Sequence, residues 1–469
     1  MTHHQKQTKP SDIPIDAGTQ PDEYYDKVLF WPRAWARRCL VPLVRAETDI
    51  LARFQRAVRY PVLDDFFMWT ANLGTHTFFM VMLPLLFWFG YSEYGRGLVM
   101  LSGCGVILSS LLKDFLCLPR PFAPPLIRLS LSSSTSAEYG FPSTHSTNSV
   151  SISLFFLSHL LSATSSPSPF LVALIAFYCF SVVFGRLYCG MHSLTDVIGG
   201  ITIGAGLWAL QLKFHLIIEN FLFESGWGIW APLFFVAAGL LLVWVHPDPV
   251  DRCPCFEDSV CFTSVIFGVL GGSWYFAKTP YAWSTPTVAT VPYDVGAIGV
   301  AGSVMRIVFG IIVLFIWRLV AKKACYFLLP PIYRSLNLPH RNFEVAAKDY
   351  RSLHDEPIGR VPSVIHLPEL NPDAPADERD FRKRRQSHSE KHILAAAKPN
   401  GFTDSVKGKP VTANGEDKRI GEDIPLRYDV DIVTKLIVYA GIGWHAVCTI
   451  PVLFELIPGL SVRISMGFA

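Results

Sequence analysis

Apolar runs long enough to cross about 30 Å of hydrocarbon recur along most of the chain. Backbone polar groups must be paired inside lipid, and these runs are longer than the alternating segments of a membrane barrel, so they predict helices. The pattern predicts an all-α fold, a polytopic transmembrane helical bundle with about nine spans. The runs lie near residues 75–91, 96–112, 147–163, 169–185, 195–212, 229–245, 259–276, 295–320 and 431–457.

Two polar regions interrupt this pattern. Residues 28–60 mix Trp, Leu and Val with Arg at short intervals, which fits either an interfacial helix or a cytosolic helical hairpin. The pattern predicts five parts: a polar N-terminal segment (1–60), a transmembrane core that holds the candidate chemistry (61–245), additional transmembrane helices (246–334), a largely disordered polar insert (335–428), and a last transmembrane helix with the C-terminus (429–469).

Composition agrees with a membrane protein. Hydrophobic residues make up 51% of the 469 residues, charged residues only 17%, and the mean hydropathy is +0.33. A net charge of +3 gives no basis for nucleic-acid binding. The first sixty residues show no cleaved secretory signal, so the first true span is expected to direct membrane entry.

Two smaller features carry weaker expectations. The basic stretch FRKRRQSHSEK, residues 381–391, is expected to be a solvated charge run; contact with anionic lipid or phosphorylation of Ser387 is the alternative. Most of the ten cysteines are expected to pack as small apolar side chains. Cys253, Cys255 and Cys261 could include a disulfide if their loop is lumenal, and no metal site is predicted there.

Three polar clusters stand at the margins of predicted helices. The first, KDFLCLPRP, follows the second run and begins at Lys113; the second, YGFPSTHSTNSVS, precedes the third run and begins at Tyr139; the third, GRLYCGMHSLTD (185–196), separates the fourth and fifth runs. Counting spans between them places all three on one face of the membrane. Polar groups far apart in sequence are therefore expected to converge at one mouth.

The charges of these clusters favour an anionic ligand. Lys113, Arg120 and Arg186 would bring together three positive charges, which is costly near lipid unless an anion neutralises them. Phosphate fits, because Arg offers planar multi-donor recognition of its oxygens and Lys a compact charge. Pro142 with Ser143 resembles a helix start, whose free N–H groups and dipole also favour an anion.

Two histidines add the groups that phosphate-ester cleavage requires. His192 and Asp196 are four apart, so on a helix they share a face, and the carboxylate could hold one imidazole nitrogen as N–H while the other attacks phosphorus. His145 could protonate the departing alkoxide and later deprotonate the water that hydrolyses the phosphohistidine. The scheme needs no metal or cofactor.

Each piece also has a simpler interpretation. Lys113 and Arg120 could be anchors that reach toward the membrane surface, and His192 with Asp196 could form a structural hydrogen bond or part of a metal site. His145 could serve in capping. Cys189 is expected to pack rather than react, because no clear base lies near it in the sequence. Only the coincidence of all the pieces on one face favours catalysis.

The three clusters together resemble the tripartite signature of the type 2 phosphatidic acid phosphatase superfamily, which also contains vanadium haloperoxidases and glucose-6-phosphatase. Its pattern is Lys-x6-Arg-Pro, then Pro-Ser-x-His, then Ser-Arg-x5-His-x3-Asp, and order and spacing match here over roughly residues 60–245. The matching residues are Lys113, Arg120 and Pro121, then Pro142, Ser143 and His145, then Arg186, His192 and Asp196.

The resemblance implies a haloperoxidase-like helical core and a role for each site residue. It makes His192 the nucleophile, His145 the acid/base and Asp196 the partner of His192. Gly185 departs from the pattern, since the family usually has Ser there; the departure removes a hydroxyl donor, and activity with reduced transition-state stabilisation is expected. The implied phosphate ligands are Lys113, Arg120, Ser143 and Arg186.

Within the superfamily the chain looks most like the sphingosine-1-phosphate phosphatases, including the fungal enzymes acting on phosphorylated long-chain bases. The stretch LGTHTFFMVMLPLLFWFG near residue 73 and the second and third clusters carry this resemblance. It implies a multi-pass protein of the endoplasmic reticulum membrane that dephosphorylates sphingoid base phosphates. The bilayer and that lipid are the expected partners, and no protein partner is indicated.

Alternatives remain open. The signature residues would bind the phosphate and not the rest of the substrate, so phosphatidate, a polyprenyl diphosphate or glucose 6-phosphate are other possible substrates. A non-enzymatic transporter or lipid-binding protein is an alternative from a different functional class. Orientation is in conflict as well. Basic residues before residue 60 and in the insert would make the site's face cytosolic by the positive-inside tendency, whereas the resemblance implies a lumenal site, the orientation we adopt.

Overall fold

The computed structural model describes residues 16–130, 138–251, 253–336, 338 and 427–465. All of these fall within one compact unit. Within them the secondary structure is helical, apart from one isolated antiparallel bridge between Trp283 and Thr290. The predicted all-α class is confirmed. Most of the 335–428 insert, including residues 381–391 and Ser387, lies outside the described residues.

The N-terminal segment forms α1 (Asp22–Val28) and one long helix, α2 (Trp31–Val58), rather than a hairpin within 28–60. Arg33 donates to the main-chain carbonyls of Asp114 and Phe115 at 2.7 and 2.9 Å, and Arg37 donates to that of Cys117 at 2.6 Å. A helix end leaves its last carbonyls without intrahelical partners. Arg33 and Arg37 of α2 therefore donate hydrogen bonds to the carbonyl groups at the C-terminal end of α5 (Ser92–Leu116).

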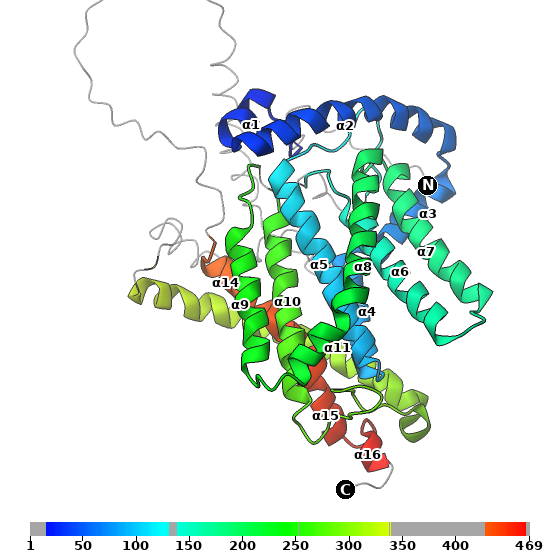
Figure 1. Ribbon diagram of the computed structural model, residues 1–469, viewed down its shortest axis with the longest axis vertical. Helices are drawn as coiled ribbons and strands as arrows, with labels where there is room; N and C mark the ends of the chain where they lie inside the picture. Colours follow the sequence, from blue (N-terminus) through cyan, green and yellow to red (C-terminus); the bar gives the residue numbers. More distant parts are fainter. Residues whose placement is uncertain (1–15, 131–137, 252, 337, 339–426, 466–469) are drawn as a thin grey trace, which may run out of the picture. The chain divides into compact units, whose positions relative to one another are not determined.

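The core helices follow in antiparallel succession (Figure 1). The helix α6 packs against α5, α7 and α8, and α5 packs in turn against α10. A short 3-10 turn, η2 (Ala71–Gly74), joins α3 to α4. Their bounds are α3 (Pro61–Thr70), α4 (His76–Trp88), α6 (Thr144–Ala163), α7 (Pro169–Tyr188) and α8 (Leu194–Phe223).

Further helices extend the bundle beyond the core. In this part of the bundle, α14 packs against both α10 and α11. A buried ion pair ties this part together: Arg306 lies 3.3 Å from Glu455, and both side chains are fully buried. The bounds are α9 (Trp230–Val245), α10 (Cys255–Phe276), α11 (Val295–Ser335), α14 (Val430–Trp444), the π-helical η4 (His445–Thr449), α15 (Ile450–Leu456) and α16 (Val462–Ser465).

The described helices confirm a multi-pass membrane protein but not the count of nine spans. Six are long and apolar enough to cross a bilayer, or seven if the bent pair α3–α4 is one span. Each of the nine predicted runs is helical, but α9 has only 16 residues, and α6, rich in Ser, is not among the six. Large apolar side chains such as Phe177, Leu216 and Ile316 are exposed, as expected where helices face lipid.

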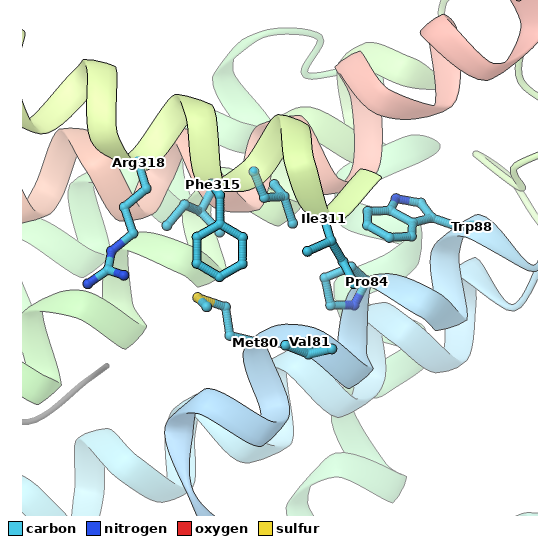
Figure 2. A pocket seen from close by; sticks show the side chains of 9 residues that line it. Met80, Val81, Pro84, Trp88, Ile311, Phe315 and Arg318 are labelled. Carbon is cyan, nitrogen blue, oxygen red and sulfur yellow. The ribbon is translucent and has the colours of Figure 1, made fainter. Parts of the chain in front are cut away.

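Two apolar pockets lie in the described bundle away from the polar clusters. One lies between α4 and α11, with Met80 and Pro84 on one wall and Phe315 and Arg318 on the other (Figure 2). The second lies between α4, α5, α10 and α14 and includes Phe79, Val99 and Tyr439 in its lining. No residue of the three polar clusters lines either pocket, so neither is the candidate site.

Candidate active site

The predicted site residues come from helix ends that meet at one end of the bundle. Lys113 lies in the last turn of α5 and Arg186 in the last turn of α7, whereas His145 lies in the first turn of α6. Arg120 follows α5, and its Nη1 lies 3.3 Å from Nε2 of His192, just before α8. Residues separated by 72 positions are thus in direct contact, as the clustering on one face predicts.

His192 does not lie on a helix, contrary to the expectation that His192 and Asp196 share a helical face. The chain turns at Gly190, where φ is +63°, and α8 begins only after its N-cap, Ser193. Ser193 and Asp196 form a capping box, in which Asp196 Oδ2 accepts from the Ser193 N–H at 2.8 Å. The same oxygen lies 3.5 Å from His192 Nδ1, so the cap brings the pair together.

Arg120 fixes the chemical state of His192. Its Nη1 donates to the Met191 carbonyl at 2.7 Å and faces Nε2 of His192. Guanidinium groups have no acceptor, so Nε2 must accept and the imidazole proton must sit on Nδ1, beside Asp196. Burial and the neighbouring cations Arg120 and Lys113 hold the pKa of His192 well below its usual value of 6.5, which keeps the ring neutral.

Ser143 and His145 occupy the start of α6. Ser143 is its N-cap, with Oγ accepting from the Ser146 N–H at 3.4 Å and from the Ser146 hydroxyl at 3.0 Å. The Ser143 N–H donates to the Asp196 carbonyl at 3.0 Å, which joins the second cluster to the third. His145 is half-buried, and its ring packs against Gly74 of η2, where a Cβ would lie 2.7 Å from Cδ2.

A carboxylate that the sequence analysis missed lies between the cations. Glu138 Oε2 lies 3.0 Å from Lys113 Nζ and 3.1 Å from Arg120 Nη2. Burial alone would raise the pKa of Glu138, but Lys113 and Arg120 outweigh that effect and lower it to about 2. The signal was available: buried cations require a counter-charge, and Glu138 directly precedes the second cluster.

Arg186 differs from the other two cations. It is 5% exposed, and its Nε is buried without a hydrogen-bond partner among the described residues. A buried guanidinium donor without an acceptor is costly. The Nε–H of Arg186 is therefore available to donate a hydrogen bond to an anion in the site.

The structure gives a packing reason for Gly185. A Cβ at this position of α7 would lie 3.2 Å from Cδ1 of Phe67, a buried ring of α3. A serine there would force Phe67 to shift. Cys189, in the same cluster, is fully buried, and burial raises the pKa of its thiol, which agrees with a packing role.

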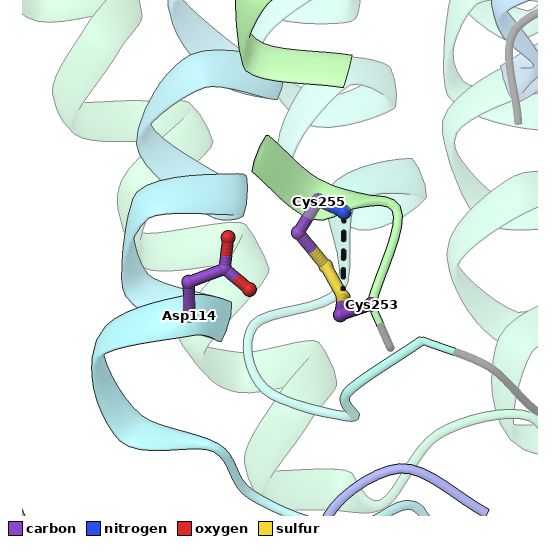
Figure 3. Close-up of side chains that lie close together, drawn as sticks. All are labelled: Asp114, Cys253 and Cys255. Atoms are coloured by element: carbon purple, nitrogen blue, oxygen red, sulfur yellow. Dashed lines mark hydrogen bonds between the residues drawn. A yellow bond between two sulfur atoms is a disulfide. The ribbon is translucent and has the colours of Figure 1, made fainter. Parts of the chain in front are cut away.

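A second buried group lies behind the site and is separate from it. The carboxylate of Asp114 accepts no hydrogen bond among the described residues, and its Oδ2 lies 3.7 Å from His246 Nδ1. Its carboxylate lies near Cys253 and Cys255, whose sulfurs are joined in a disulfide (Figure 3). Neither sulfur is a free thiolate, and Cys261 is a free, buried cysteine of α10.

Comparison with known proteins finds a family and several relatives. The PAP2 superfamily matches residues 94–218. A dihydrosphingosine 1-phosphate phosphatase of Schizosaccharomyces pombe is 34% identical over 88% of this chain and 88% of the relative. A second, of Saccharomyces cerevisiae, is 33% identical over 68% of this chain and 78% of the relative. Lipid phosphate phosphatase delta of Arabidopsis thaliana is 27% identical over 60% and 67%.

These matches and the converging helix ends define the class. The chain belongs to the PAP2 superfamily, together with the fungal dihydrosphingosine 1-phosphate phosphatases that it matches over most of its length. No solved structure matches the chain. The resemblance seen in the motifs is thereby confirmed.

Two glycines of α8 allow the start of α8, next to His192, to lie close to the start of α6, which carries His145. A Cβ at Gly200 would lie 2.6 Å from the Ser143 carbonyl oxygen, and one at Gly204 would clash with the Thr147 carbonyl oxygen. Small residues at this spacing allow two membrane helices to approach closely. The α6–α8 crossing, and with it the distance between His145 and His192, depends on this approach.

We expect Gly200→Ala to lower the melting temperature of the detergent-solubilised protein, because the new Cβ must push α6 away. Gly206→Ala is the matched control, since a Cβ there meets nothing within 4 Å. Alanine favours helix over glycine by up to about 1 kcal/mol, so the control should be neutral or stabilising. Equal effects of the two substitutions would contradict the close crossing.

Proposed function

We propose that this protein is a membrane lipid phosphatase that hydrolyses the phosphate monoester of sphingoid base 1-phosphates without a metal. The observation that carries the proposal is the placement of His192, whose Nε2 lies 3.3 Å from Arg120 and whose Nδ1 lies 3.5 Å from Asp196. The names of the matched relatives supply the substrate class. The chemistry follows from the placement of the side chains.

In the first step, Arg120 Nη1 turns from Nε2 of His192 to a phosphoryl oxygen, which frees the Nε2 lone pair. Nε2 then attacks phosphorus, and the bond from phosphorus to the lipid oxygen breaks. His145 gives its proton to the departing alkoxide, which leaves as the free sphingoid base alcohol. In the second step, water attacks the phosphohistidine, His145 takes up a water proton, and the P–N bond breaks. Inorganic phosphate leaves, and His192 returns to its neutral form.

The remaining residues orient His192 and stabilise the negative charge on the phosphoryl group. Asp196 keeps the proton on Nδ1 and stabilises the imidazolium character that develops as Nε2 bonds to phosphorus. Lys113, Arg120 and Arg186 bind the phosphoryl oxygens, on which charge is greatest in the transition state. Ser143, the N-cap of α6, and the positive end of the α6 helix dipole complete this binding set.

We further propose that the protein resides in the endoplasmic reticulum membrane with its active site facing the lumen. Contacts of Arg33, Arg37 and Gln55 place α2 at the end of the bundle that carries the site. Arg427 and Tyr428, just before α14, contact the last turns of α9 near the same end. The Cys253–Cys255 disulfide beside Asp114 supports an oxidising compartment on this side.

A substrate panel tests the function. Purified protein should hydrolyse dihydrosphingosine 1-phosphate faster than phosphatidate, lysophosphatidate or glucose 6-phosphate, as measured by phosphate release. Vanadate should compete, because it adopts the five-coordinate geometry of the transferring phosphoryl group. EDTA should change little. Loss of activity in EDTA that Mg²⁺ restores, or the absence of any hydrolysis, would refute the proposal.

Substitution of the two central residues tests the mechanism. We expect His192→Ala to lower kcat by about 1,000-fold or more, because it removes the nucleophile. Asp196→Asn keeps an acceptor for the Ser193 N–H but lacks the carboxylate charge, and should lower kcat by about 100-fold. Cys189→Ala is the control and should change kcat less than about threefold. Retention of most activity by His192→Ala would exclude the phosphohistidine route.

Protease protection of tagged protein in sealed microsomes tests the orientation. Tags at the N-terminus and within residues 339–426 should both be protected, because the helices next to them share the site's end of the bundle. A C-terminal tag is the control and should be digested, since α15 runs to the other end beside Arg306. Digestion of the first two tags with protection of the third would place the site in the cytosol.

A further inference from the structure

Glu138 lies where the phosphate of a substrate would be bound. One carboxylate oxygen, Oε2, accepts from both Lys113 Nζ and Arg120 Nη2, at 3.0 and 3.1 Å. The two cations are 6% and 3% exposed, whereas the Glu138 side chain is 27% exposed. The carboxylate therefore covers the buried cations on the side from which an anion would approach.

The main chain at Glu138 and directly after it is anchored by hydrogen bonds to neighbouring segments. Arg120 Nε donates to the Glu138 carbonyl at 3.1 Å, and the Gly140 N–H donates to the Leu118 carbonyl at 2.8 Å. Tyr139 is fully buried, and its hydroxyl accepts from the Asp251 N–H at 2.9 Å. Three rotatable side-chain bonds let the carboxylate turn aside without any change in this anchored main chain.

Arrival of a phosphate group changes the environment of this carboxylate. Lys113 and Arg120 are needed by the phosphoryl oxygens, so Oε2 must give up at least part of both contacts. Before this exchange the carboxylate is ionised, because Lys113 and Arg120 lower the pKa of Glu138 to about 2. A displaced carboxylate beside a phosphate dianion is repelled, and partial burial strengthens that repulsion. A cation at this position would remove the repulsion and pair the displaced carboxylate.

We propose that Glu138 binds the ammonium group of the sphingoid base and so selects phosphorylated amino lipids. This inference rests on the proposed function. In these substrates the ammonium group is on the carbon next to the ester carbon, so it enters the site together with the phosphate, within reach of an anchored glutamate. Phosphatidate and simple alkyl phosphates bring no cation there and leave the displaced carboxylate unpaired, which disfavours them.

Kinetics of Glu138→Gln on two lipids test the proposal. The lipids are dihydrosphingosine 1-phosphate and octadecyl phosphate, which lacks the amine. The variant should lower kcat/KM for the first by about 10- to 100-fold, the range expected for a charged hydrogen bond. It should leave kcat/KM for octadecyl phosphate unchanged or raise it, because the repelling carboxylate is gone. The ratio of the two values therefore falls.

Glu257→Gln is the matched control. Glu257 is also a partly exposed glutamate paired with a lysine, at 2.8 Å from Lys435, but it joins α10 to α14 outside the site. It should leave the substrate ratio unchanged. Glu138→Asp keeps the charge on a shorter side chain and should restore part of the preference.

Two results would overturn the proposal. An equal loss on both lipids would show that Glu138 only positions Lys113 and Arg120, and an equal gain would show that it only competes with phosphate. The wild-type protein tests the underlying function separately. If it hydrolyses octadecyl phosphate but not the sphingoid base phosphate, the substrate class is wrong whatever Glu138→Gln does.

Discussion

Three positive charges at neighbouring helix ends, shielded from water, are the constraint on which the site depends. Lys113, Arg120 and Arg186 are all buried. Coulomb repulsion between them grows as water is excluded, so the folded protein tolerates them only with an anion close by. Glu138 supplies part of that negative charge, and the Nε of Arg186, which has no hydrogen-bond partner among the described residues, indicates that one carboxylate does not satisfy all three cations. This deficit favours the binding of an anionic group at the site.

Local backbone features convert the charge cluster into an ordered site. The capping box of α8 places Asp196 against His192, and the Ser143 N–H reaches across to the Asp196 carbonyl. Glycines of α8 permit the close crossing with α6 that keeps these two helix starts adjacent. Helix starts therefore do two things at once: they satisfy their own backbone groups and they orient the reacting side chains.

The sequence predicted the class of fold and the meeting of the three clusters, because helix length, apolar runs and motif spacing are local properties. Three features depend on tertiary packing and were not predicted. Glu138 became a site residue only through the approach of its loop to two cations. His192 reaches Asp196 through a capped turn rather than a helical face. Phe67, far from the signature, explains why Gly185 has no side chain.

The N-terminal helix α2 has a consequence for where the folding unit begins. It lies outside the residues matched by the superfamily, yet Arg33 and Arg37 hold the carbonyls that end α5, directly after Lys113. A fragment that begins at the boundary of the family match would lack α2, and these buried carbonyl oxygens would lose their hydrogen-bond donors. The segment that carries Arg120 would then no longer be held in place. The folding unit is thus larger than the region that the superfamily matches, and α2 is a structural part of the core that carries the candidate site.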